Sequence, residues 1–181
     1  MPNPGIMTLT TPDQHNAAAE IASAAPTGGW IIEVGCWLGY GTIILGESKD
    51  PSVLLTCIDP FPSEDVPKET ESGLYAAYSF DEWKKNTQDI PNLEYIRGFS
   101  PADLFDVPFT KNPDVVVIDL KQITESLIFW DKLMVSGGKF LVHTYYPSFG
   151  FTDLIDEITE FLKTRPYRLE DLDCSAILTK G

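Results

Sequence analysis

Three glycines in the first third of the chain are spaced as in loops that bind nucleotides. Gly35, Gly39 and Gly41 follow a short apolar run and precede a stretch that suits a helix. At such a place glycine lets the backbone turn tightly and lets a ligand approach closer than a Cβ atom allows. The pattern therefore predicts a nucleotide-like ligand. The residues expected to contact it are Glu33, Gly35, Cys36, Trp37, Gly39, Tyr40, Gly41 and Thr42.

Glu33 indicates the charge of that ligand. Dinucleotide sites direct a helix N-terminus at a pyrophosphate, whereas Glu33 places a carboxylate where the apolar run ends. The spacing also departs from GxGxxG, because Trp37 stands where that fingerprint has its second glycine. Both observations weaken the case for a nicotinamide cofactor. They favour a ligand with a cationic head, such as the methionine ammonium of S-adenosylmethionine (SAM).

A second acid follows the next apolar run. Asp59 stands where a carboxylate accepts hydrogen bonds from ribose hydroxyls, each worth roughly 1.5 to 3 kcal/mol. The alternative is a turn residue before Pro60. Together with Glu33 and the glycines, Asp59 favours ribose binding.

The elements that must position these residues are those of a β-α-β unit. Residues 30–34 and 53–58 are apolar runs short enough for buried strands, and residues 42–47 between them suit a helix. Ahead of this unit, Asp13 is the predicted N-cap of a helix through residues 17–25. Parallel strands joined by a helix predict a parallel sheet.

The rest of the chain continues this alternation and then ends it. Apolar residues at helical spacing, from Ile123 to Met134, predict a helix whose stripe packs on the core. The last two predicted strands are joined by so few residues that they form a hairpin. The further predicted elements are strands at 93–97, 114–118, 139–142, 167–172 and 175–179 and helices at 80–88 and around 154–161. The predicted fold class is α/β: a Rossmann-like, open, mostly parallel seven-stranded sheet with helices on both faces and an antiparallel C-terminal strand pair, in a single domain spanning residues 1–181.

Composition limits the partners. The 27 acidic and 13 basic residues give a formal charge of −14, which repels nucleic acids and anionic membranes. The three cysteines form no CxxC motif and no Cys/His cluster, so neither zinc nor a disulfide framework is expected. No apolar run approaches the ~20 residues of a membrane span. These features predict a soluble, cytoplasmic protein with a small-molecule substrate, and they leave open whether it forms a homo-oligomer.

With these residues in view, the chain resembles the class I SAM-dependent methyltransferases over nearly its full length. The stretch from Glu33 to Thr42 is similar to their first motif, particularly in small-molecule O-methyltransferases of the catechol and caffeoyl-CoA type. The resemblance implies that Asp59 is the ribose acid and that Asp119 lies beside the sulfonium of the cofactor. It also implies that three residues form the loop against the adenine, with Phe99 able to stack on the base. These are Gly98, Phe99 and Ser100.

Departures from that family bear on the chemistry. Metal-dependent relatives have further acids, and often a histidine, where this chain has Lys121, Gln122 and Thr144. A divalent cation needs several oxygen ligands, so Asp119 beside an ammonium group is a poor site. We therefore expect no catalytic metal. The same departures are compatible with a degenerate member that binds the cofactor without transferring a methyl group.

Methyl transfer requires that the donor and acceptor be positioned and that an acceptor proton be removed where one must leave. His143, predicted at the end of the fifth strand, is the first candidate base, with a buried structural histidine as the alternative. Asp119 is the second candidate, and Lys121 is a candidate to stabilise an acceptor oxyanion. Tyr145 and Tyr146 either line the acceptor pocket or pack at the strand end.

Two other functions remain in view. A nicotinamide-dependent reductase would normally carry a Tyr-x-x-x-Lys or comparable motif, which the chain lacks. A cofactor-binding partner or regulatory subunit would bind the cofactor without turnover. Residues 60–78, rich in Pro, Ser and acids, are either a lid over the site or an ordinary surface loop.

Overall fold

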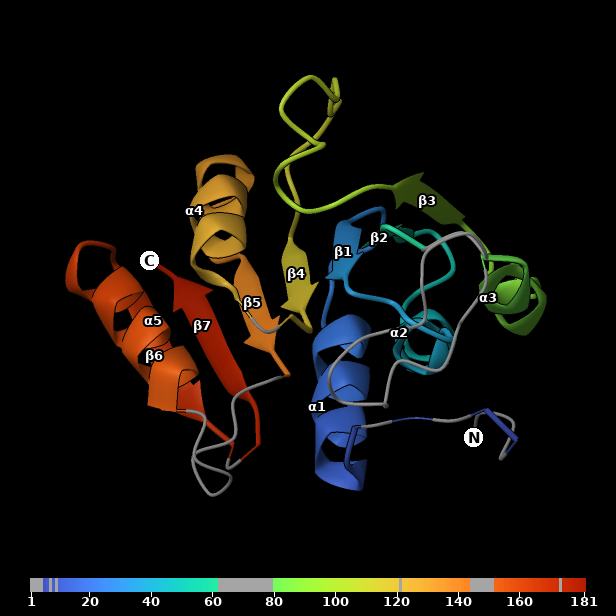
Figure 1. Ribbon diagram of the computed structural model, residues 1–181, viewed down its shortest axis with the longest axis horizontal. Coiled ribbons are helices and arrows are strands. Elements are labelled where there is room, and N and C mark those ends of the chain that lie inside the picture. The colour runs from blue at the N-terminus through green and yellow to red at the C-terminus, as the bar shows by residue number, and fades with distance from the viewer. Residues whose placement is uncertain are drawn as a thin grey trace, which may run out of the picture.

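Seven strands form one sheet in the order β3-β2-β1-β4-β5-β7-β6 (Figure 1). The computed structural model describes residues 5–6, 8, 10–61, 80–120, 122–143, 152–172 and 174–181. The strands are β1 (Trp30–Val34), β2 (Leu54–Asp59), β3 (Leu93–Arg97), β4 (Val115–Ile118), β5 (Lys139–Val142), β6 (Tyr167–Asp171) and β7 (Ala176–Lys180). The helices are α1 (Pro12–Ser23), α2 (Tyr40–Ser48), α3 (Phe80–Thr87), α4 (Thr124–Leu133) and α5 (Thr152–Lys163).

Strands β1 to β5 run parallel, and β7 lies antiparallel between β5 and β6. The predicted fold class is therefore confirmed, including the C-terminal hairpin. The predicted bounds of β1, β3 and β5 agree with the structure, and the other strands differ by one residue at an end or both.

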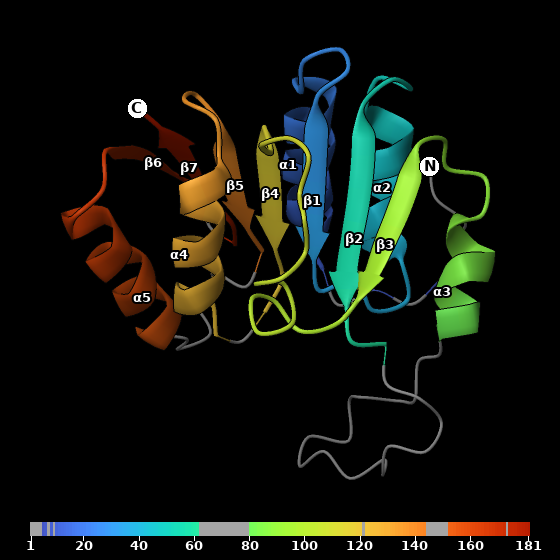
Figure 2. The same cartoon turned by 90° about the horizontal axis from the view of Figure 1, so that it is seen from above.

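The sheet is covered on both faces, as Figure 2 shows. Because side chains alternate along a strand, Ile32 and Val34 of β1 face the core formed with α4 and α5, whereas Ile31 faces the core formed with α1, α2 and α3. The stripe predicted from Ile123 to Met134 is buried in the first of these cores. Strands β1, β2, β4 and β5 are thus largely buried on both faces, which leaves their ends to form a site, whereas the edge strand β3 is partly exposed.

The first helix begins earlier than the sequence suggested. Its N-cap is Thr11, not Asp13: the Thr11 hydroxyl accepts from the backbone N–H of Gln14, and the Gln14 side chain accepts from the backbone N–H of Thr11. Pro12 fits the first helical position because its missing N–H is not needed there. Asp13 lies in the first turn, where its charge suits the helix dipole.

Helix α4 begins without a side-chain cap from its own N-cap residue. Instead, Glu157 of α5 accepts hydrogen bonds from the backbone N–H groups of Ile123 and Thr124 and from the Thr124 hydroxyl. A carboxylate is well suited to this place because the helix dipole is positive there. This contact fixes α5 against the start of α4.

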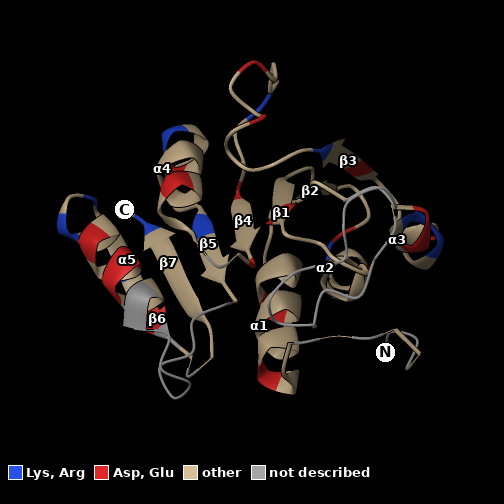
Figure 3. Cartoon of the chain, in the orientation of Figure 1, with Lys and Arg blue, Asp and Glu red and all other residues tan. Residues whose placement is uncertain are grey.

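Acidic residues occur on α1, α3, α4 and α5, which carry red segments in Figure 3. None of the described helices is long and apolar enough to cross a membrane.

Candidate functional site

The candidate site lies at the carboxyl ends of β1, β2 and β4. Strand β1 has β2 on one side and β4 on the other, so the strand order reverses beside it, which is where open α/β sheets bind ligands. Hydrogen bonds extend past the strand ends: the N–H of Gly35 donates to Ile58 O, and the N–H of Asp119 donates to Val34 O. The loops after the three strands are therefore held side by side.

The glycine loop after β1 uses left-handed backbone conformations. The φ angles are 87° at Gly35, 43° at Trp37 and 88° at Gly39. A Cβ atom on Gly35 would lie 2.4 Å from Asp119 O, and one on Gly41 would lie 2.7 Å from Glu33 Oε1. Packing within the protein thus accounts for both glycines, in addition to any role in ligand approach.

Gly39 is the N-cap of α2, and no side chain caps that helix. A Cβ atom on Gly39 would lie 2.9 Å from the methyl group of Thr87 and 3.0 Å from the Trp83 ring. Contact with α3 therefore requires glycine at this position of the loop. Tyr40, the next residue, begins α2 at the edge of the site.

Asp59, the predicted ribose acid, is the last residue of β2 and is buried. Its Oδ2 accepts from the backbone N–H groups of Cys36 at 2.9 Å and Trp37 at 3.2 Å, and its Oδ1 accepts from that of Phe61 at 2.8 Å. The carboxylate therefore joins the glycine loop to the segment after β2. Sequence reasoning assigned the acid to a ribose and missed this structural role.

Glu33 is buried beneath the start of α2. Its Oε2 accepts from the Thr42 hydroxyl at 2.5 Å and from the Cys57 thiol at 3.2 Å, and Trp83 Nε1 donates to Thr42 Oγ1 at 3.2 Å. Burial raises the pKa of the Glu33 carboxyl to about 7, against the opposing effect of its hydrogen bonds. A nearby cation would favour the ionised form.

Asp119 follows β4 and lies between the carboxyl ends of β1 and β5. Its side chain is half-buried, and burial raises its pKa to about 6. Its charge also acts on Glu33 and contributes to the raised pKa of that residue. Two acids with raised pKa values at the switch point of the sheet mark a site that would be stabilised by positive charge.

Two cysteines that are far apart in sequence come together at this site. Glu33 and Cys57 are register partners on β1 and β2, and Cys36 follows β1. The ligand atoms of Glu33, Cys36 and Cys57 all lie within 4.8 Å of one another. The spacing of the cysteines along the chain did not indicate this proximity, because it depends on the register of neighbouring strands. Burial raises the pKa of both thiols, that of Cys57 to about 11, so they act here as weak donors.

The loop after β3 contains the residues predicted to lie against adenine. Phe99 is 63% exposed and Gly98 is close to Asp103, whose Oδ2 accepts from the N–H of Phe99 at 2.8 Å. Ser100 is joined to α4, since Trp130 Nε1 donates to its hydroxyl and Ser126 donates to its carbonyl. A cavity of about 390 Å³ opens beside this loop. It is lined by Ser100, Gln122, Thr124, Glu125, Ser126 and Glu157.

His143 directly follows β5, as predicted, and only 6% of it is exposed. Its Nδ1 lies 3.4 Å from the Ser175 hydroxyl. Burial, and then the charge of His15, lowers its pKa to about 4, so the imidazole is neutral at pH 7. The side chain of Gln14 donates to the carbonyl groups of His143 and Cys174, which places the start of α1 over the end of β5.

His15 and Gln14 belong to the surroundings of the site, although neither was among the predicted site residues. The His15 ring lies 4.7 Å from that of Tyr40, and its Nε2 is 2.6 Å from the Thr10 hydroxyl. For Gln14, the capping sequence from Thr11 to Gln14 was an available signal of its place in the first turn of α1.

Several predicted residues fall outside the described part of the chain. These are Lys121, Thr144, Tyr145, Tyr146 and most of the proposed lid at residues 60–78. Of that segment, Phe61 is described and is buried against Phe80 and Trp83.

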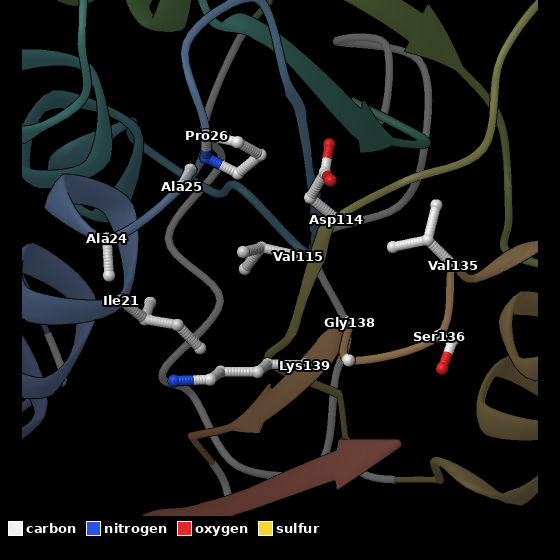
Figure 4. Close-up of a pocket in the computed structure, with 11 residues that line it drawn as sticks. Ile21, Ala24, Ala25, Pro26, Asp114, Val115, Val135, Ser136, Gly138 and Lys139 are labelled. Carbon is white, nitrogen blue, oxygen red and sulfur yellow. The ribbon is translucent and has the colours of Figure 1, made fainter. Parts of the chain in front are cut away.

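A second cavity lies at the opposite edge of the sheet. It has a volume of about 190 Å³. Figure 4 shows that its lining residues come from the end of α1 and the loop after it, from the amino ends of β4 and β5, and from the turn before β5. It is therefore separate from the glycine loop and the three acids.

Many solved structures share this fold. A proposed methyltransferase from Streptococcus mutans in complex with SAH superposes with a TM-score of 0.62 at 12% identity, over 92% of this chain and 97% of that one. An rRNA methylase from Streptococcus thermophilus gives a TM-score of 0.62 at 13% identity over 96% and 99%. A SAM-dependent O-methyltransferase from Thermotoga maritima gives 0.66 at 13% identity over 96% and 67%. No protein-family model matches the chain, and no curated protein matches its sequence.

The chain has the class I SAM-dependent methyltransferase fold, with strand order 3-2-1-4-5-7-6 and a glycine loop after β1. Within that class, its structural neighbours include both O-methyltransferases and rRNA methylases.

Proposed function

We propose that the protein is a SAM-dependent methyltransferase that acts on a small-molecule acceptor, at oxygen and without a metal. The observation that carries this proposal is the pair of acids with raised pKa values, Glu33 and Asp119, at the switch point of a class I methyltransferase fold. A ligand with positive charge relieves the cost of ionising these groups.

The residues at the site fit such a cofactor. The two acids suit a sulfonium and an ammonium group. The left-handed turn from Gly35 to Gly39 leads into α2, whose N-terminus has no side-chain cap. The cavity beside Ser100 has the volume of a small-ligand site, and we assign it to the base of the cofactor. In this arrangement exposed Phe99 is available to cover that base.

When bound, SAM would supply an electrophilic methyl group, which passes to an acceptor oxygen by in-line displacement with the sulfur leaving as the neutral thioether of SAH. The chain itself positions the two molecules and holds the acceptor proton. Asp119 suits proton transfer better than His143, because its pKa of about 6 is closer to neutral pH than the value of about 4 at His143. We therefore place Asp119 ahead of His143 as the proton acceptor, which reverses the order that the sequence suggested.

Charge favours a small acceptor over RNA. The net charge of −14 opposes contact with a phosphate backbone, although an rRNA methylase is among the structural neighbours. The three cysteines are free, which agrees with a cytoplasmic location as part of this proposal.

A cofactor-binding protein without turnover is the alternative. Asp59 supports this alternative. Its carboxylate already accepts hydrogen bonds from three backbone N–H groups, so it is not dedicated to binding a ribose. A nicotinamide-dependent reductase is the less favoured reading, since the acids at the site oppose a pyrophosphate.

Calorimetric titration tests the assignment directly. SAM and SAH should bind and raise the melting temperature, whereas NAD should do neither. Binding of NAD with no response to SAM or SAH would contradict the cofactor. Incubation with methyl-labelled SAM and a panel of hydroxylated small molecules and rRNA then separates the acceptors, and tight binding with no transfer to any of them would favour the alternative.

A further inference from the structure

The four tryptophans of the chain differ in what their indole N–H groups contact. Trp30 donates to the Thr56 hydroxyl at 2.8 Å, and Trp83 and Trp130 donate to the hydroxyl groups of Thr42 and Ser100, each at 3.2 Å. Trp37 is the exception: its Nε1 is buried and has no hydrogen-bond partner among the residues that the structure describes.

A buried donor without a partner is unfavourable by about 1 to 3 kcal/mol, and buried polar side chains are paired in most proteins. Trp37 also has a φ of 43°, a left-handed conformation that a bulky residue rarely adopts and that costs on the order of 1 to 3 kcal/mol. Both features fall on one residue of the glycine loop. Such residues persist where the strained arrangement has a function.

The rest of the loop shows what fixes Trp37 in place. Its backbone N–H donates to Asp59 Oδ2, and so does the N–H of the preceding residue, Cys36. Residues Gly35 and Gly39 on either side take left-handed conformations of their own. The backbone of Trp37 is therefore fixed without any hydrogen bond from its ring nitrogen.

We propose that the indole N–H of Trp37 donates a hydrogen bond to an oxygen atom of the bound cofactor, so that the ligand supplies the partner that the protein lacks. An indole N–H donates only, which restricts the partner to an acceptor atom: a ribose hydroxyl or the methionine carboxylate. The inference rests on the proposed function for the identity of the ligand. Because Nε1 is covered in the ligand-free protein, the contact requires a small adjustment around the ring.

The test compares Trp37→Phe with the wild type by calorimetry and thermal unfolding. Phenylalanine keeps an aromatic ring but removes the donor. SAM affinity should fall about tenfold, while the ligand-free variant should lose only the packing of the larger ring, since no hydrogen bond is removed. The matched control is Trp30→Phe, which removes a paired donor far from the site. Its melting temperature should fall, and its SAM affinity should not change.

Ligand fragments distinguish the two acceptor oxygens. Methylthioadenosine has the ribose without the carboxylate, so a loss of affinity for this compound in Trp37→Phe assigns the ribose. A loss that is confined to SAM and SAH assigns the carboxylate.

Unchanged SAM affinity in folded Trp37→Phe would overturn the inference and leave the proposed function intact. If the wild type binds neither SAM nor SAH, the proposed function fails first. Should the variant not fold, the indole N–H signals of the wild type provide a second measurement: one of the four should move and gain exchange protection on binding SAM, and no such change would overturn the inference.

Discussion

The carboxylate of Asp59 lies 2.9 Å from the backbone nitrogen of Cys36 and accepts a hydrogen bond from it. This bond joins the end of β2 to the loop after β1, and similar bonds from Trp37 and Phe61 complete the contact. The acid that the sequence assigned to a ribose therefore shapes the loop that the ligand must meet.

Replacement of this acid should affect folding and binding together. Asp59→Asn has one acceptor oxygen in place of two and no charge, so it cannot serve all three N–H groups. We expect a loss of roughly 2 to 4 kcal/mol in the free energy of unfolding and about thirtyfold in SAM affinity. Denaturant titration and calorimetry measure the two effects. Weaker binding at unchanged stability would instead support direct contact with ribose, as the sequence suggested.

The ratio of the affinities for SAM and SAH should depend on pH, because Asp119 changes its charge near neutral pH. Its pKa of about 6 means that it is about one-tenth ionised at pH 5 and mostly ionised at pH 7.5. The preference for SAM, which carries a sulfonium, over SAH, which does not, should therefore rise up to about tenfold over this range. Asp119→Asn should reduce this rise to the part contributed by Glu33. A preference that is independent of pH in the wild type would place the sulfonium away from Asp119.

Stability at acid pH should depend on His143. Its pKa is about 4 in the folded protein and 6.5 as the unperturbed value, so the unfolded chain binds the proton more readily between these limits. The stability that the neutral imidazole contributes is fully present above pH 6.5 and is lost as the pH falls toward 4, by about 3 kcal/mol in total. His143→Gln lacks this loss.

Urea unfolding of both proteins at pH 7 and pH 4.5 measures this difference. The raised pKa values of Glu33 and Asp119 act in the opposite direction but are present in both proteins, so they cancel in the comparison. An equal pH dependence in the two proteins would mean that His143 is accessible to protons when folded.

Turnover should not depend on a divalent metal. Among the described residues, the one cluster of three candidate ligands is Glu33, Cys36 and Cys57, and it excludes Asp119. A carboxylate alone is a poor magnesium site. Activity measured after treatment with a chelator should match the untreated enzyme, and recovery on addition of magnesium would show oxygen ligands outside this cluster.

The fold was more predictable than the site. The strands at 30–34 and 139–142 each follow a pair of glycines and are apolar apart from Glu33 and Lys139, so their bounds follow from pattern alone. The meeting of Cys36 with Cys57 depends instead on the register of β1 against β2, which a single sequence does not specify. The bonds of Asp59 depend on φ angles in the glycine loop, and an acid at a strand end looks the same whether its partner is a ligand or the backbone.

Gln14 has a consequence for the order in which the molecule is built. Its side chain donates to carbonyl groups 129 and 160 residues further along the chain. During synthesis, the first helix is made long before either partner leaves the ribosome, and contacts of such separation form late. The edge of the site at β5 is therefore completed only when the last hairpin has emerged, so a nascent chain that stops short of β7 should contain the glycine loop without a finished pocket.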